Sequence, residues 1–154
     1  MSRISAHIEV DVPVAVAYDQ WSQFEAWPGF MDGVERVLQL DPTTLDWTAT
    51  IAGRTKHWRA RLVEQLSGEL ISWRSVDGAR NDGIVRFTPL TGDGCRVELE
   101  LDVEPEGLIE AAAGALGFAS RRVSGDLQRF RELVESRGRA TGAWRGRVED
   151  GRVR

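Results

Sequence analysis

The chain opens with an alternation of apolar and polar residues that is typical of a half-buried β-strand. Apolar side chains occupy the even positions from Ile4 to Val12, and polar ones fill the odd positions between them. Pro13 ends this strand and suits the first turn of a helix. The apolar residues that follow keep helical spacing: Val14, Ala17, Tyr18 and Trp21. A second helical turn around residues 24–27 ends at Pro28-Gly29.

The middle of the chain reads as six further strands separated by glycine, asparagine, aspartate and proline turns. Connections this short join antiparallel neighbours, because a parallel crossover needs a dozen residues or more. We therefore predict an antiparallel meander with strands at residues 34–40, 44–52, 55–65, 69–76, 82–88 and 94–103.

The parity of the apolar residues gives this sheet one apolar face and one wet face. The last strand alternates most clearly, with apolar residues from Cys95 to Val103 and charged residues between them. Earlier strands place tryptophan, alanine, isoleucine, leucine, valine and phenylalanine on the inner face: Trp47, Ala49, Ile51, Trp58, Ala60, Leu62, Ile71, Trp73, Val85 and Phe87.

A long helix is predicted to cover the apolar face. Residues 108–136 contain no proline and repeat apolar or small residues at alternating spacings of three and four, which is one stripe of a helix: 109, 113, 116, 120, 123, 127, 130 and 134. Gly138 suits its C-terminal end. These elements form one α+β domain over residues 1–138, and the polar, glycine-rich residues 139–154 are predicted to be a flexible basic tail.

Composition fits a soluble, cytoplasmic protein. The chain has 154 residues, of which 42% are hydrophobic and 29% charged, as in ordinary globular domains. It has no apolar run of membrane-spanning length, and its first residues lack the apolar core of a secretory signal. We therefore expect no integral membrane contact. The single Cys95 cannot form an internal disulfide, which favours a reducing compartment.

Charge is distributed unevenly. The net charge is −4, yet residues 137–154 hold six arginines against two acidic residues. The body is therefore acidic and would repel a phosphate backbone, so we do not expect it to bind nucleic acid. The arginine–glycine segments around Trp144 leave open an interaction module that uses the tail, although a solvated terminus explains the same composition.

The element order resembles the START-like (SRPBCC, helix-grip) superfamily, and most closely its branch of polyketide cyclase/dehydrases with coenzyme-Q-binding and lipid-transfer proteins. The resemblance covers residues 1–137. It is carried by these segments: Ile8-Glu9-Val10, Pro13-Val14, Tyr18, Trp21-Ser22-Gln23-Phe24-Glu25, Trp27-Pro28, Phe30-Met31, Glu64-Gln65, Ile71-Ser72-Trp73-Arg74-Ser75, Asn81-Asp82-Gly83 to Phe87, and Arg96-Val97-Glu98-Leu99. It implies a curved antiparallel sheet wrapped around the C-terminal helix, with a cavity between them for a hydrophobic ligand.

Candidate ligand contacts lie on both walls of that cavity. Three inner-face indoles leave N–H groups that need a partner or a ligand, and glycines in the helix leave room beneath it. A filled aromatic core and close helix packing explain the same residues. Asn81 could orient a ligand carbonyl or serve only its turn. The candidates are Trp47, Trp58, Trp73, Phe87, Leu99, Asn81, Gly114, Gly117 and Phe118.

No catalytic, metal or cofactor site is predicted. His7 and His57 fall on outward faces, and Cys95 faces inward without a histidine beside it. The acidic residues of the last strand form a solvated row: Glu98, Glu100, Asp102 and Glu104.

Two functions thus remain beside the tail module. The first is binding, for transport or sequestration, of a hydrophobic molecule such as a polyketide, quinone or lipid. The second is a polyketide aromatase/cyclase-dehydrase that acts by folding its substrate. The sequence predicts no oligomeric state.

Overall fold

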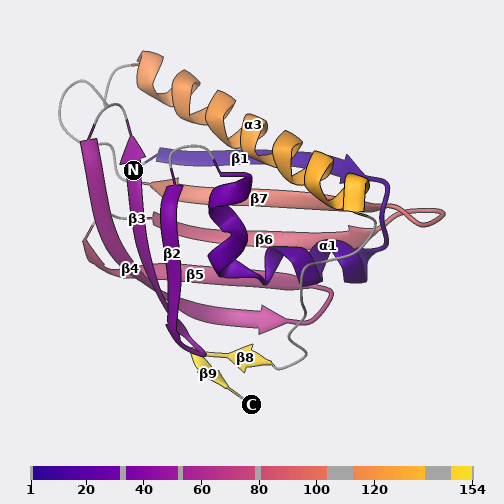
Figure 1. Ribbon diagram of the computed structural model, residues 1–154, viewed down its shortest axis with the longest axis horizontal. Helices are drawn as coiled ribbons and strands as arrows, with labels where there is room; N and C mark the ends of the chain where they lie inside the picture. Colours follow the sequence, from indigo (N-terminus) through magenta and orange to yellow (C-terminus); the bar gives the residue numbers. More distant parts are fainter. Residues whose placement is uncertain are drawn as a thin grey trace.

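One curved antiparallel sheet forms the body of the protein (Figure 1). The computed structural model describes residues 2–31, 34–51, 54–78, 81–103, 113–137 and 147–153. The strands of the sheet follow the order β1-β7-β6-β5-β4-β3-β2. Their bounds are β1 (Ser2–Val10), β2 (Val34–Asp41), β3 (Thr44–Ile51), β4 (Arg54–Leu66), β5 (Leu70–Gly78), β6 (Asn81–Pro89) and β7 (Cys95–Val103).

The strands and their inner faces confirm the sequence prediction. Each predicted strand range agrees with the structure to within two residues at either end. The apolar residues assigned to the inner faces of these strands are buried wherever their side chains are described, except Leu101, which is partly buried against the core. In the last strand, Cys95, Val97 and Leu99 are buried, and the charged residues between them are half-exposed.

A bulge in β4 changes which residues face inward near the end of that strand. The register to β5 shifts between Leu62 and Glu64. Strict alternation from Leu62 would turn Glu64 inward, but the shift turns Gln65 inward instead, and its side chain is 1% exposed. The bulge therefore buries a neutral amide at a position where alternation would have buried a carboxylate.

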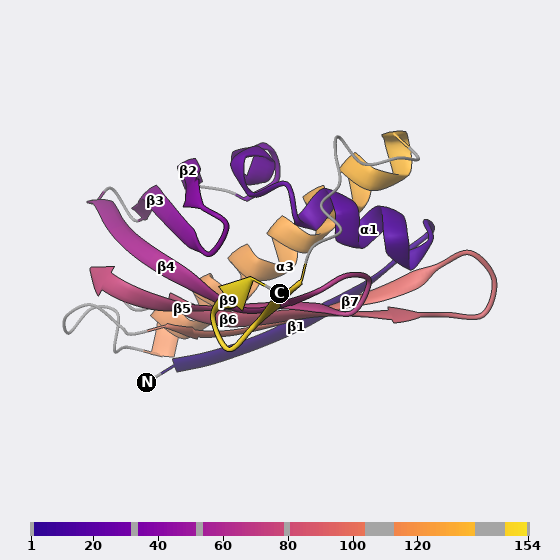
Figure 2. The same cartoon turned by 90° about the horizontal axis from the view of Figure 1, so that it is seen from below.

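The helices lie on one face of the sheet, toward which β2 and β3 also curl (Figure 2). Helix α1 (Val14–Trp21) leads into the 3₁₀ turn η1 (Phe24–Gly29), and α3 (Ala113–Arg137) runs along β1. The described part of the α3 stripe is buried as predicted: Val123, Leu127, Phe130 and Val134. Arg129 ties α3 to the end of η1, because its Nε donates to the carbonyl oxygen of Phe30 at 2.9 Å. None of the described helices combines the length and apolar character of a membrane span.

The end of the predicted tail forms a small hairpin on β4. Strands β8 (Val148–Glu149) and β9 (Arg152–Val153) pair with each other, and Val148 lies opposite Gln65. The amide of Gly151 donates to the carbonyl oxygen of Val63 at 2.9 Å. Because β4 continues past the start of β3, these residues of β4 have a free edge that a further strand can pair with. Residues 138–146, Trp144 among them, lie outside the described residues.

Candidate functional site

The inner faces of β3, β4 and β5 bring together three tryptophans, here called the sheet tryptophans: Trp47, Trp58 and Trp73. Trp47 and Trp58 are direct cross-strand partners, and their rings stack with centroids 5.3 Å apart and planes inclined by 17°. Trp73 lies opposite Leu62 on β5. Each of the three is 3% exposed. The sequence prediction that they share a buried face is confirmed.

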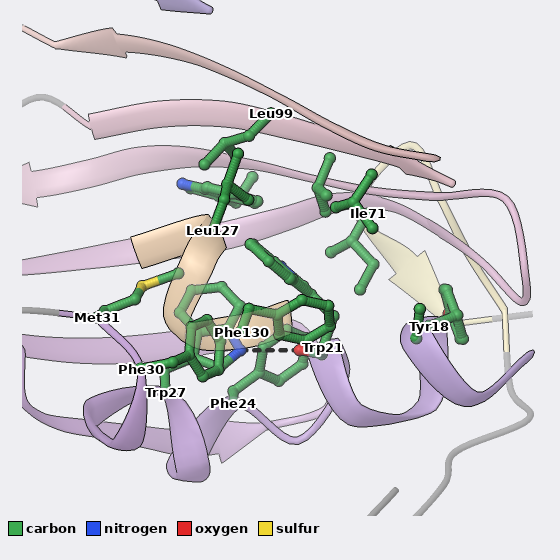
Figure 3. Packing of buried hydrophobic residues seen from close by; sticks show 14 of the residues in the cluster. Tyr18, Trp21, Phe24, Trp27, Phe30, Met31, Ile71, Leu99, Leu127 and Phe130 are labelled. Atoms are coloured by element: carbon green, nitrogen blue, oxygen red, sulfur yellow. Dashed lines mark hydrogen bonds between the residues drawn. The ribbon is translucent and has the colours of Figure 1, made fainter. Parts of the chain in front are cut away.

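Trp27 of η1 packs onto the sheet tryptophans from the opposite side. Its ring centroid lies 4.8 Å from that of Trp47 and 5.7 Å from that of Trp73, in edge-on contacts. Its Nε1 donates to the carbonyl oxygen of Trp21 at 2.8 Å, drawn as the dashed line in Figure 3. The side chain of Trp27 is fully buried. The sheet tryptophans are thus covered by an indole from the helical layer.

A second aromatic group surrounds Trp21. Its ring centroid lies 4.9 Å from that of Phe130 on α3, 5.4 Å from that of Phe30 and 6.3 Å from that of Phe87. Phe87 also meets Tyr18 edge-on at 5.6 Å. Phe87 was predicted to lie with the sheet tryptophans, and the structure places it in this second group, against Trp21 and Tyr18.

Leu99, on β7, is buried on the same face of the sheet, toward Leu127 of α3 (Figure 3). The burial of both candidates, Phe87 and Leu99, is confirmed. Their contact with a ligand stays a prediction.

Several buried polar atoms near these rings lack hydrogen bonds. Within the described part of the chain, the Nε1 atoms of Trp21, Trp47 and Trp58 and the Oε1 atom of Gln65 have no partner. An unsatisfied buried donor costs about 1–3 kcal/mol, and native interiors contain few of them. Three indole donors and one amide acceptor are therefore buried without a hydrogen-bond partner among the described residues.

The position of Trp73 depends on Gly83. Gly83 of β6 lies between Trp73 of β5 and Leu101 of β7 in the register of the sheet. A Cβ atom on Gly83 would lie 2.4 Å from Cζ2 of Trp73 and 2.8 Å from Cδ2 of Leu101. The indole therefore lies over the bare backbone of this glycine, which explains why the strand carries no side chain there.

The candidates on the helix and at the turn are only partly described. Gly114, Gly117 and Phe118 belong to α3, and Asn81 is the first residue of β6, paired with Val103. Their side-chain surroundings lie outside the described residues, so their roles remain predictions.

Acid–base chemistry has few candidates on the described inner surface. Among the described residues, Asp19 of α1 is the one buried charged side chain. Burial raises the pKa of Cys95 to about 11, so its thiol is protonated at neutral pH. His7 and His57 are exposed, and Nε2 of His57 lies 2.7 Å from Oδ1 of Asp46. The described residues contain no group of three or more histidine, cysteine, aspartate or glutamate side chains arranged to hold a metal ion.

Sequence reasoning missed the aromatic residues that come from the helical layer. Trp21, Trp27, Phe30 and Phe130 make most of the ring contacts. One sequence signal could have indicated them: aromatic residues are concentrated between positions 18 and 30. Short helices there depend on tertiary packing for their stability, so these rings had to pack against the rest of the domain. Gln65 was also missed, because its inward turn depends on the bulge.

Comparison with known proteins places the chain in a family. The family described as polyketide cyclase / dehydrase and lipid transport matches residues 10–131. A 17.2 kDa Streptomyces lincolnensis protein from the melC2-rnhH intergenic region is 42% identical over 96% of this chain and 99% of its own length. The persistence and stress-resistance toxin PasT of Escherichia coli O6:H1 is 30% identical over 89% of this chain and 92% of its own.

A solved structure has the same fold. The START superfamily protein from Mycobacterium smegmatis superimposes with a TM-score of 0.77 over 87% of this chain and 97% of its own, at 18% identity. The chain therefore belongs to the polyketide cyclase/dehydrase and lipid transport family and has the START fold.

Proposed function

We propose that this protein binds a hydrophobic small molecule, such as a polyketide, quinone or lipid, between the inner face of the sheet and the helical layer. Membership of a family described by cyclase, dehydrase and lipid transport activities supports a hydrophobic ligand. The similarity to PasT favours no class of molecule, because that name states a cellular effect and no ligand.

The observation that carries this proposal is the set of buried indole N–H groups without a partner. Trp47 and Trp58 hold their rings on the apolar face of the sheet, and neither Nε1 has an acceptor among the described residues. A ligand that contributes apolar area and one acceptor atom would remove the cost of one of these donors.

The affinity of such a complex can be bounded. Burial of about 300 Å² of apolar ligand surface offers about 7 kcal/mol at about 25 cal/mol per Å². Association and side-chain ordering subtract several kcal/mol, and the hydrogen bond returns about 1 kcal/mol. A micromolar dissociation constant needs about 8 kcal/mol, which is the sum of these two gains before the association cost is subtracted, so micromolar is the tightest affinity expected for a ligand of this size.

Native mass spectrometry of the freshly purified protein tests the proposal. We expect the wild-type protein to carry an adduct of about a few hundred daltons, the mass of a small-molecule ligand, and Trp73→Ala to lose it. Val76→Ala is the matched control, because Val76 lies on the same strand with 58% of its side chain exposed. A bare mass for the wild-type protein, together with no binding of added tricyclic ketones, would contradict the proposal.

Cyclase/dehydrase activity is a second candidate, favoured by the family and by the position of Tyr18. Substrate folding still needs an acid or base near the enolising carbon. Tyr18 is buried, and its ring contacts Phe87 on the inner face. Tyr18→Phe removes only the hydroxyl. If the protein is a cyclase that uses this hydroxyl, the variant should cyclise a linear poly-β-ketone thioester more slowly than the wild-type protein but bind it equally tightly. Liquid chromatography with mass spectrometry follows the cyclisation.

A further inference from the structure

Trp27 differs from the other tryptophans of the cluster in the element that holds it. The sheet tryptophans come from strands with neighbours on both sides. Trp27 comes from η1, a six-residue 3₁₀ turn that contains Pro28. Turns of this kind have poorer hydrogen-bond geometry than an α-helix, and they often mark hinges.

Among the described residues, side-chain hydrogen bonds hold η1 against its neighbours. The carboxylate of Glu25 accepts from the amide of Gln39 on β2 at 3.0 Å. Arg129 of α3 donates to the carbonyl oxygen of Phe30, and Trp27 donates to that of Trp21. The Arg129 side chain is 42% exposed, so its bond can open to water. The segment is therefore fastened by side-chain hydrogen bonds, and Trp27 and Phe24 are its buried apolar side chains.

The contacts of Trp27 define a place for a planar group. Its ring meets Trp47 and Trp73 on the sheet side and Phe24 on its own side. The donors of Trp47 and Trp58, which stack beside this place, have no acceptor among the described residues. The buried side chains that make these ring contacts carry no charge, so a charged group would be desolvated there without compensation.

We propose that Trp27 is a displaceable plug and that η1 is the gate of the ligand site. When η1 swings outward, a planar, uncharged ring system takes the place of Trp27 against Trp47 and Trp73. A carbonyl or ether oxygen on this ring system accepts from an indole N–H of Trp47 or Trp58. This inference rests on the proposed function and narrows it to acceptor-bearing polycyclic molecules.

The binding kinetics of two tricyclic probes test the gate. Fluorene and 9-fluorenone share one ring frame and differ by a carbonyl oxygen, and each is followed by stopped-flow tryptophan fluorescence. Arg129→Met and Glu25→Ala each remove one fastening of η1 and should speed association about twofold to tenfold, the range for one lost hydrogen bond. Arg131→Met is the control, because Arg131 is on the same helix and pairs with Glu135 at 3.2 Å instead.

Equilibrium binding of the same two probes tests whether the ligand occupies the position of the Trp27 ring. Trp27→Ala should bind fluorenone faster and more tightly than the wild-type protein, because the ligand no longer competes with an indole. Fluorenone should bind at least about fivefold more tightly than fluorene, and Trp47→Phe with Trp58→Phe should remove this preference.

The outcomes separate the two proposals. Wild-type binding with equal rates in all the arginine and glutamate variants would overturn the gate and leave the proposed function standing. Equal affinity for the two probes would overturn the acceptor requirement. Absence of binding to both the wild-type protein and Trp27→Ala would overturn the proposed function and the gate with it.

Discussion

Replacement of Gly83 by alanine should destabilise the protein, although the backbone at this position tolerates a side chain. Gly83 does not have a positive φ, unlike Gly68, Gly92 and Gly151. At such a position alanine usually stabilises by about 0.4–1 kcal/mol, because it restricts the unfolded chain. The sign of the change is therefore decided by what the new methyl group meets in the folded state.

The methyl group meets a rigid ring. The added Cβ would lie 2.4 Å from Cζ2 and 2.8 Å from Cε2 of Trp73, well inside contact distance. The indole cannot move away freely, because it is 3% exposed and its ring packs edge-on against Trp27, with the centroids 5.7 Å apart. Overpacking of this kind costs about 1–3 kcal/mol. After the entropic gain, we expect a net loss of about 1–2 kcal/mol in the free energy of unfolding.

Thermal and urea denaturation measure this loss. A chain of this size changes its Tm by about 2–4 °C per kcal/mol. Gly29→Ala is the control, because a Cβ there meets nothing within 4 Å. Adding Trp73→Phe to Gly83→Ala should recover part of the loss, and the double-mutant cycle isolates this contact. If Gly83→Ala were as stable as the wild-type protein, the indole would not lie over Gly83, and the placement of the sheet tryptophans would be wrong.

Three further changes test other parts of the structure. Val148→Thr buries a hydroxyl on β8 and should cost about 1–2 kcal/mol in urea denaturation, whereas Val153→Thr, at a side chain 50% exposed, should change stability by less than about 0.5 kcal/mol; equal effects would contradict the docking of the hairpin. Gly125→Ala in α3 meets only the flexible end of Arg129 and should stabilise by up to about 1 kcal/mol; a loss of stability would show that this part of α3 packs differently. Cys95 should resist a thiol reagent at pH 8 until the protein unfolds. Because its folded pKa is raised to about 11 from 9.0, its stabilising contribution is complete below about pH 9 and is lost as the pH rises toward 11, and rapid native labelling at pH 8 would refute its burial.

Alternation and turn chemistry predict most of this fold because both act locally. Ile4 to Val12 alternate with polar residues, and short turns separate the later strands, so neighbouring strands had to pair antiparallel. The inner positions of Trp47, Trp58 and Trp73 follow from parity alone. Parity carries no information about which rings touch, because contacts between layers depend on how η1 and α3 are placed in space. Trp27 was therefore absent from the predicted site, although it contacts two of the sheet tryptophans.

Gln65 and the C-terminal hairpin show where local rules end. Leu62 and Gln65 both face inward, which strict alternation forbids, because the bulge at Val63 inserts a residue. The carbonyl oxygen of Val63 accepts a hydrogen bond from the amide of Gly151, which lies more than eighty positions later in the chain. No pattern in the sequence of the last residues predicts this pairing, because the edge they pair with exists only once β4 extends beyond β3.

The ring contacts of the sheet tryptophans and Trp27 indicate how this aromatic cluster could serve both packing and ligand binding. If the sheet tryptophans served packing alone, the unsatisfied N–H groups of Trp47 and Trp58 would destabilise the fold without any compensating interaction. Phenylalanine could fill the stacked positions without an unsatisfied donor. If they served only as an open pocket, Trp27 would not be fully buried against them. A resident indole that packs on Trp47, beside the stacked ring of Trp58, accounts for both observations. It keeps the apolar face closed in the absence of ligand, and the donors favour a ligand with an oxygen over the indole that it replaces.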